Sequence, residues 1–490
     1  MSERKPATNQ EDRLEHILKL LRGSEDVVTQ TIGAGQSHNQ VFRILSCSGM
    51  VDMQTMYIAL LPQLEKLADQ IVGDSTEVLH RNSKHVDPNH LDGLLGNHVR
   101  LENEEDVNLF YASLYSGSVM VIHDASRRVF QFDLSNQPGR QPEESAMEIS
   151  LKGPRDGFIE KIATNVALVR RRMRTPDLHC EYWKIGTQSQ TEVALLYMES
   201  HAIPSLVAEA RERLNKIEVE TLHGAAELEE MVSDRSYSLF PLVEYVGRPD
   251  YVIQALMKGR IAMLVDGAPS AIIAPGNLTL LIKSPEDTHI PFYFVSLERL
   301  LRIVGLFLAL CLPGFWVALC SFNIDQIPFT LLATITIARR GLPISSTLEM
   351  FLMLSMFELF REAGVRLPRA VGQTVTVVGG LIIGDAAISA GLTSPTMLVT
   401  AAVTSVATFT LVNQSLSGTV SVIRYGVLLM SSMLGIFGFF ISIFVVLIYM
   451  CSLESFGRPY MEPIAPIKWR QLIPALIQSP WNIKAKGKGK

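Results

Sequence analysis

Apolar and charged residues are distributed unevenly along the chain. Charged side chains recur up to Arg302, whereas residues 303–324 and 425–453 contain none and residues 370–423 contain only Asp385. A membrane-spanning helix needs about 20 apolar residues to cross a hydrocarbon core of about 30 Å. The pattern therefore predicts a soluble N-terminal region followed by an all-α membrane domain, residues 303–452, with about five spans at residues 301–320, 343–360, 373–391, 394–412 and 426–450.

The soluble region contains an internal repeat. Gly117–Asp124 and Gly259–Asp266 each place an apolar run between a glycine and an aspartate at the same spacing. A glycine that ends a helix and leads into a short apolar run is typical of a helix followed by a buried strand. The repeat predicts two duplicated α/β subdomains with mixed sheets, residues 36–145 and 146–290, after an N-terminal amphipathic helix and linker at residues 1–35.

A basic helix is expected between the two repeats. Asp156 is its expected N-cap, and an apolar stripe runs from Phe158 to Met173. The helix is either a solvated element whose arginines favour the negative end of its dipole, or a docking or hinge element against the membrane or a neighbouring subunit. The candidate docking residues are Arg155, Arg170, Arg171, Arg172 and Arg174.

The two ends of the membrane domain have distinct compositions. Residues 291–302, PFYFVSLERLLR, form an amphipathic, aromatic segment typical of a membrane interface, and we expect it to couple the soluble and membrane regions. Residues 453–490 form a basic tail that suits anionic membrane lipid. Five spans would place this tail opposite the soluble region, against the cytosolic preference of basic residues. An extra span with a re-entrant piece in residues 328–360, or a tail along the outer interface, would resolve the conflict.

Acidic residues inside the apolar segments are the candidate functional residues, because a carboxylate at membrane depth persists only beside a partner, a bundle interior or water. Glu349 and Asp385 are the candidate acids of a pore or ion path. A threonine stripe either lines this path or bonds back to the carbonyl groups four residues earlier: Thr400, Thr404 and Thr408. The charged stretch at residues 361–369 is the candidate gate hinge, through Arg361, Glu362, Gly364, Arg366 and Pro368.

Other classes of function lack their signatures. The net charge of −5 gives no indication of nucleic-acid binding. No Walker loop and no GxGxxG after a strand are present, so we expect neither an enzyme nor a cofactor. The histidines between residues 80 and 98 are poorly spaced for a metal, and the five cysteines contain no CxxC pair, so no metal site is expected. The N-terminus lacks a signal-like apolar segment, which predicts a cytosolic soluble region.

Several motifs together resemble the A subunits of spore germination receptors from Bacillus-type spore formers. They lie between about Asp106 and Pro480 and include Gly153–Phe158, Arg248–Asp250, Ser284–Asp287, Arg361–Gly364 and Gly384–Ala387. The resemblance implies a multi-pass protein of the inner spore membrane that works with transporter-like B-type and lipoprotein C-type subunits. It also implies a homo-oligomer forming a nutrient-gated ion channel. The alternatives are a related spore-membrane channel that amplifies germination and a non-conducting scaffold or signal relay. The nutrient-binding residues are not identified by the resemblance.

Overall fold

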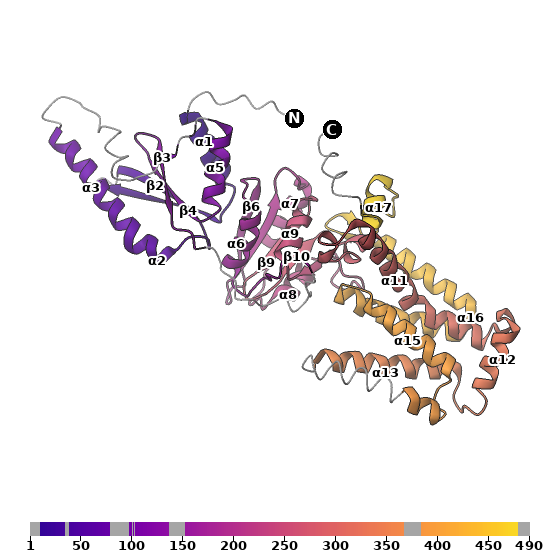
Figure 1. The fold of residues 1–490 in the computed structure, drawn as a ribbon. Helices are drawn as coiled ribbons and strands as arrows, with labels where there is room; N and C mark the ends of the chain where they lie inside the picture. The colour runs from indigo at the N-terminus through magenta and orange to yellow at the C-terminus, as the bar shows by residue number, and fades with distance from the viewer. Residues whose placement is uncertain are drawn as a thin grey trace. The chain divides into compact units, whose positions relative to one another are not determined.

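The computed structural model describes residues 10–34, 39–78, 98–99, 101, 103–136, 152–366 and 384–478. The chain falls into two compact units. The first contains residues 1–233 and 245–275, and the second contains residues 234–244 and 276–490. The first unit is α/β and the second is largely helical (Figure 1).

The first subdomain of unit 1 is a five-stranded antiparallel sheet with helices on both faces. Its strand order is β1-β2-β4-β5-β3, and every neighbouring pair runs antiparallel. Alternate strand residues enter separate cores, so that Leu45 faces α1 and α5 while Ile44 faces α3. The elements are α1 (Gln10–Leu21), β1 (Val27–Ala34), β2 (Asn39–Cys47), α2 (Met53–Thr55), η1 (Met56–Leu60), α3 (Leu61–Val78), β3 (His98–Val99), α5 (Glu104–Leu114), β4 (Ser118–His123) and β5 (Arg128–Asp133).

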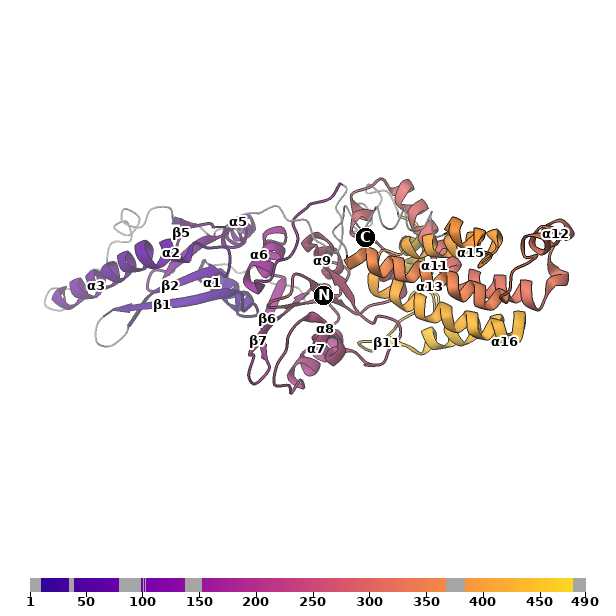
Figure 2. The ribbon, with the colours of Figure 1, turned by 90° about the horizontal axis from the view of Figure 1, so that it is seen from below.

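The second subdomain repeats this topology. Its strand order, β6-β7-β9-β10-β8, places the strands at the same successive positions as in the first sheet. Helices α6 and α9 pack together against β7 and β9, and α7 and α8 lie on the other side of the sheet (Figure 2). The elements are α6 (Ile162–Arg172), β6 (Leu178–Ile185), β7 (Thr191–Met198), α7 (Pro204–Asn215), α8 (Ala225–Val232), β8 (Glu244–Val246), α9 (Pro249–Leu256), β9 (Ile261–Val265) and β10 (Ala271–Ala274).

The structure confirms the duplication and corrects two details of it. Gly117 and Gly259 precede the equivalent strands β4 and β9 with φ of +102° and +79°, where glycine is favoured. Residues 27–34, however, form strand β1, although they were expected in a linker. Their β-branched valines, threonines and isoleucine favour a strand. The sheets are also not mixed, since all pairs with a defined register are antiparallel.

Unit 2 is built around long apolar helices. Among the described residues, α11 (Phe292–Ser321) and α16 (Gln414–Ser452) are long and apolar enough to cross a membrane. The expected interfacial linker at residues 291–302 forms the first turns of α11 rather than a separate element. The expected span at residues 373–391 lies largely outside the described residues. The other elements are α10 (Leu278–Leu281), η2 (Pro285–Thr288), η3 (Ile324–Gln326), α12 (Phe329–Ala338), α13 (Ser346–Arg366), α15 (Pro395–Phe409), β11 (Glu454–Ser455), β12 (Arg458–Pro459) and α17 (Trp469–Leu476).

Helix α16 reverses direction at Gly435, which has a non-helical backbone (φ 62°, ψ −142°). The Leu239 carbonyl accepts a hydrogen bond from Thr419, and the Leu239 amide donates to the Tyr449 hydroxyl at 3.0 Å. An unbroken helix would separate Thr419 from Tyr449 by about 45 Å. The single span expected at residues 426–450 is therefore wrong, because residues 414–434 and 436–452 are two antiparallel helices joined by a tight turn.

Candidate functional site

Arg170 joins the two subdomains of unit 1 and is fully buried. Its Nε and Nη2 groups donate to the two carboxylate oxygens of Asp26, each at 2.7 Å. Nη1 donates to the carbonyl oxygens of Thr175 and Leu178, and Nη2 also donates to Ser24 Oγ at 3.2 Å. All five N–H groups of the guanidinium are thereby used. Burial alone would lower the pKa of Arg170, but Asp26 raises it above the ordinary value.

Because Arg170 is fully buried, the docking role expected for it at a surface is wrong. Arg172 and Arg171 lie 2.6 and 3.6 Å from the carboxylate of Asp156, so Asp156 pairs with the end of the helix instead of capping its start. Helix α6 begins later, at Ile162. Arg155 and Arg174 are exposed, and a docking role for these two stays a prediction.

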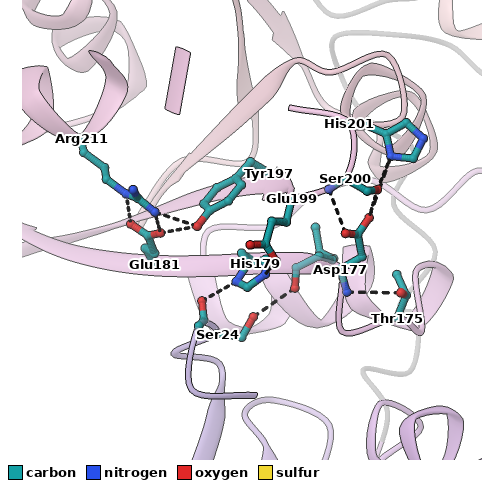
Figure 3. Close-up of polar contacts among 12 residues, drawn as sticks. Ser24, Thr175, Asp177, His179, Glu181, Tyr197, Glu199, Ser200, His201 and Arg211 are labelled. Atoms are coloured by element: carbon teal, nitrogen blue, oxygen red, sulfur yellow. Dashed lines mark hydrogen bonds and ion pairs between the residues drawn. The ribbon is translucent and has the colours of Figure 1, made fainter. Parts of the chain in front are cut away.

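Polar contacts on β6 and β7 surround the same joint (Figure 3). His179 Nδ1 lies 2.7 Å from the carbonyl oxygen of Gly23, and Nε2 lies 3.0 Å from the Glu199 carboxylate. The ring therefore bridges the turn after α1 and the residue that follows β7. Nearby, Arg211 and Tyr197 donate to the Glu181 carboxylate. Burial opposes the charge of Glu181, yet these hydrogen bonds lower its pKa overall.

In unit 2, Glu349 is fully buried and binds the start of α15. Its Oε1 accepts hydrogen bonds from the Ser394 amide at 2.5 Å, the Ser394 hydroxyl at 2.6 Å and the Thr393 hydroxyl at 3.1 Å. Arg339 approaches the other oxygen at 3.7 Å. A carboxylate favours the positive end of a helix dipole, so Glu349 fastens α13 to the N-terminus of α15.

A second charged cluster, which the sequence analysis missed, surrounds Arg424 on α16. Its Nη2 lies 3.2 Å from Glu358 Oε2, and its Nη1 donates to Thr408 Oγ1 at 3.0 Å. Arg361 pairs with the other oxygen of Glu358 and donates to Ser417 at 3.0 Å. Arg424 is the only charged residue between Asp385 and Glu454, which is the sequence signal that could have identified it.

The threonine stripe is buried and bonds to its own helix. The hydroxyls of Thr400, Thr404 and Thr408 donate to the carbonyl groups four residues earlier, at 2.9, 2.8 and 2.9 Å. The sequence allowed this stripe either to line an ion path or to bond back to its own helix, and the geometry matches the bonding within the helix.

In contrast, Asp385 lies on a helical segment at residues 384–389 and its side chain is exposed.

The candidate hinge is only partly described. Helix α13 continues through Arg361, Glu362 and Gly364 to Arg366, so these positions are helical and do not form a bend. Glu362 is exposed and Gly364 is half-buried. Pro368 lies outside the described residues, and a hinge beyond Arg366 stays a prediction.

A third buried ionic cluster holds the start of α11. Asp287 accepts hydrogen bonds from Arg299 Nε at 2.8 Å and from Arg302 Nη1 at 2.9 Å. Arg299 also donates to the Ala475 carbonyl at 3.2 Å and to Gln478 Oε1 at 3.1 Å, next to α17. The cluster therefore fixes the segment that precedes α11, the first turns of α11 and the C-terminal helix to one another.

Comparisons with known proteins identify the family of this chain. A model of the Bacillus/Clostridium GerA spore germination protein family matches residues 15–488. Spore germination protein XA of Bacillus anthracis is 43% identical over 369 residues, which cover 75% of each chain. Spore germination protein KA of Bacillus subtilis (strain 168) is 31% identical, covering 94% of this chain and 83% of that protein. The uncharacterized membrane protein YfkQ of the same organism is also 31% identical, covering 96% of this chain and 89% of that protein.

Among solved structures, the crystal structure of the N-terminal domain of the A subunit of the Bacillus megaterium spore germinant receptor GerK3 is 26% identical, with a TM-score of 0.37. The match covers 56% of this chain and 98% of that one. The family assignment rests on the sequence matches, because the family model spans nearly the whole chain and several relatives exceed 30% identity. This membrane protein therefore belongs to the GerA family of spore germination proteins and is an A subunit of a germinant receptor.

Proposed function

We propose that the chain forms a nutrient-gated ion channel in the inner spore membrane, assembled from several copies of itself with B-type and C-type receptor subunits. The observation that supports this proposal best is the exposed carboxylate of Asp385 within an otherwise uncharged stretch of residues 370–423. A charge is costly against lipid, so Asp385 requires water or another protein surface.

The arrangement of the other candidates favours a path between subunits. In an oligomeric channel with a central pore, the residues that line the pore are exposed on each isolated subunit. Asp385 meets this condition, whereas Glu349 and Thr404 are fully buried within one chain. We therefore assign the ion path to Asp385, and we assign the packing of α13, α15 and α16 to Glu349, the threonines and Arg424.

The reversal at Gly435 bears on the membrane topology. The Leu278 amide donates to the Tyr460 carbonyl at 3.3 Å, and the Gln478 amide donates to Ser296 Oγ at 3.1 Å. The residues after α16 thus lie beside the residues that precede and begin α11. We propose that both ends of the membrane domain face the cytosol, which places the basic tail where basic residues are preferred.

Gating in this proposal starts in the soluble region. Asp287 lies on the segment that leads into α11 and binds Arg299 and Arg302 of that helix. A rearrangement that moves this segment would therefore move α11, against which α15 and α16 pack. The partner subunits would bias this two-state movement when nutrient is sensed.

The experiment is ionic current through membranes that contain the chain with and without its partner subunits. We expect Asp385→Asn to assemble normally and to reduce cation current severalfold, because the carboxylate attracts cations to the path. Asp325→Asn is the matched control, since Asp325 is an exposed acid of the same unit that lies in η3, outside the apolar stretch. Normal current in an assembled Asp385→Asn complex would remove Asp385 from the mechanism.

The main alternative is a non-conducting scaffold or signal relay. Absence of current in every subunit combination, with the complex intact, would favour it. Current from this chain alone, without any nutrient dependence after the partners are added, would favour the related channel that amplifies germination. Subunits of this family are not enzymes.

A further inference from the structure

Helix α17 carries an apolar stripe that faces away from the rest of unit 2. Trp469 and Ile473 lie four residues apart on the helix and are 66% and 53% exposed. Ile477, which follows the helix with an extended backbone, is 57% exposed. Residues spaced by four share one face of a helix. Lys468 and Arg470 flank this stripe and are also exposed, and Lys468 pairs with Glu462 at 2.5 Å. The combination of an apolar face with basic flanks is typical of helices that lie in a membrane surface.

Helix α17 lies beside the start of α11 (Figure 1), and polar contacts hold the two together. Arg299 donates to the carbonyl oxygens of Pro474 and Ala475 at the end of α17, and the Gln478 amide donates to Ser296 Oγ. Arg299 and Arg302 are the last charged residues before the uncharged run of residues 303–324. Helix α17 is therefore attached at the level where α11 changes from charged to fully apolar.

The first turns of α11 present a similar exposed stripe. Tyr293, Leu297 and Leu301 also recur every four residues and are 66%, 52% and 55% exposed. Aromatic residues with apolar neighbours at the end of a spanning helix are typical of the boundary between lipid headgroups and acyl chains. This stripe lies at the same level of α11 as the attachment of α17, although Arg299 reaches α17 from another side of the helix. It leads into the uncharged run of residues 303–324.

We propose that α17 and the first turns of α11 form an interfacial collar that binds anionic phospholipid. The stripe of Trp469, Ile473 and Ile477 inserts at the level of the acyl-chain boundary, and Lys468 and Arg470 bind the headgroup phosphates. A partner protein is the less favoured occupant, because the surface lies at the level where α11 becomes fully apolar and charge-free. This proposal requires only that the chain is embedded in a membrane, and it does not depend on ion conduction.

The test uses the full chain in nanodiscs with Trp469 as the only tryptophan, in a W183F/W316F/W481F background. Fluorescence is compared between discs that contain the same fraction of brominated phosphatidylcholine or brominated phosphatidylglycerol. We expect both lipids to quench Trp469, and the anionic lipid to quench about fivefold more effectively, the enrichment that one basic residue near an anionic surface provides. The substitutions K468Q and R470Q together should abolish the difference and leave the quenching by phosphatidylcholine.

Three results would overturn the proposal. Quenching by aqueous acrylamide without quenching by brominated lipid would place the stripe in water. Protection from both quenchers would mean that protein, such as a second copy of the chain, covers it. Equal quenching by the two lipids would exclude anionic selectivity. If the triple tryptophan variant does not fold, the difference in quenching between the natural chain and W469F provides the same comparison.

Discussion

The joint between the two soluble subdomains provides a quantitative test of the structure. Arg170 contributes its five N–H groups to Asp26, Ser24, Thr175 and Leu178, with no exposed surface. Its guanidinium also lies 4.4 Å from the centre of the Tyr115 ring. The substitution Arg170→Met preserves most of the side-chain volume but leaves the carboxylate of Asp26 buried without its cation.

The cost follows from that uncompensated charge. Removing one partner of a buried ion pair typically costs about 3–5 kcal/mol, much more than an exposed pair contributes. For a domain of 150–250 residues, each kcal/mol corresponds to about 2–4 °C in melting temperature, so we expect a decrease of about 6–20 °C. Arg170→Lys should recover only part of the loss, because an ammonium group cannot reproduce the two parallel hydrogen bonds to Asp26.

The assay is thermal unfolding of the purified full chain in detergent, in a W316F/W469F/W481F background. It is followed by the emission of the remaining Trp183, which lies on β6. Arg171→Met is the matched control, because the Arg171 side chain is 34% exposed and lies 3.6 Å from Asp156. It should change stability by less than about 0.5 kcal/mol. The double variant Asp26→Leu/Arg170→Met should be more stable than Arg170→Met alone, since it removes the orphaned charge. Equal melting temperatures for Arg170→Met and Arg171→Met would refute the reasoning.

Two further predictions concern the acid stability of the soluble region and the membrane topology. The pKa of Glu181 is lowered from its ordinary value of 4.5, so its stabilising effect is present above that value and is lost as the pH falls through the lower folded-state pKa. The melting temperature of Glu181→Gln should therefore fall below that of the natural chain at neutral pH and approach it in acid; a difference that is constant with pH would contradict this origin. Reporters fused to the N-terminus and to the C-terminus should both be accessible from the cytosol, and a C-terminal reporter on the other side would exclude the reversal at Gly435.

Local sequence signals were sufficient for the duplicated α/β architecture. The glycine-to-aspartate spacing predicted equivalent strands, and Gly117 and Gly259 stand before β4 and β9 as that spacing requires. Charge-free runs likewise located α11 and the general region of α16. Such features depend on neighbouring residues and on helix or strand periodicity, so they are readable without knowledge of tertiary contacts.

Contacts between residues that are distant in the sequence could not be predicted from such local signals. Arg170 and Asp26 are separated by 144 residues, and nothing in the sequence around α6 distinguishes the buried arginine from its solvated neighbours. Gly435 stands in a charge-free run close to Gly438, where a glycine is as compatible with helix packing as with a reversal. The side chain of residue 435 is excluded by tertiary packing, since a Cβ there would lie 2.8 Å from Phe322 Cβ.

Ion pairs between a carboxylate and one or more buried arginines recur at three joints of the chain. Asp26 and Arg170 hold the two soluble subdomains together. Asp287, with Arg299 and Arg302, holds the start of α11 against the segment that precedes it. Glu358 and Arg424 hold α13 against α16. Such pairs add little net stability compared with apolar contacts, but separating them exposes an uncompensated charge at a cost of several kcal/mol. Each joint therefore favours a single arrangement and resists gradual deformation. In the proposed gating, this property would hold one state until a partner supplies enough binding energy to change it. The four arginines are then the positions where single substitutions should loosen that state most.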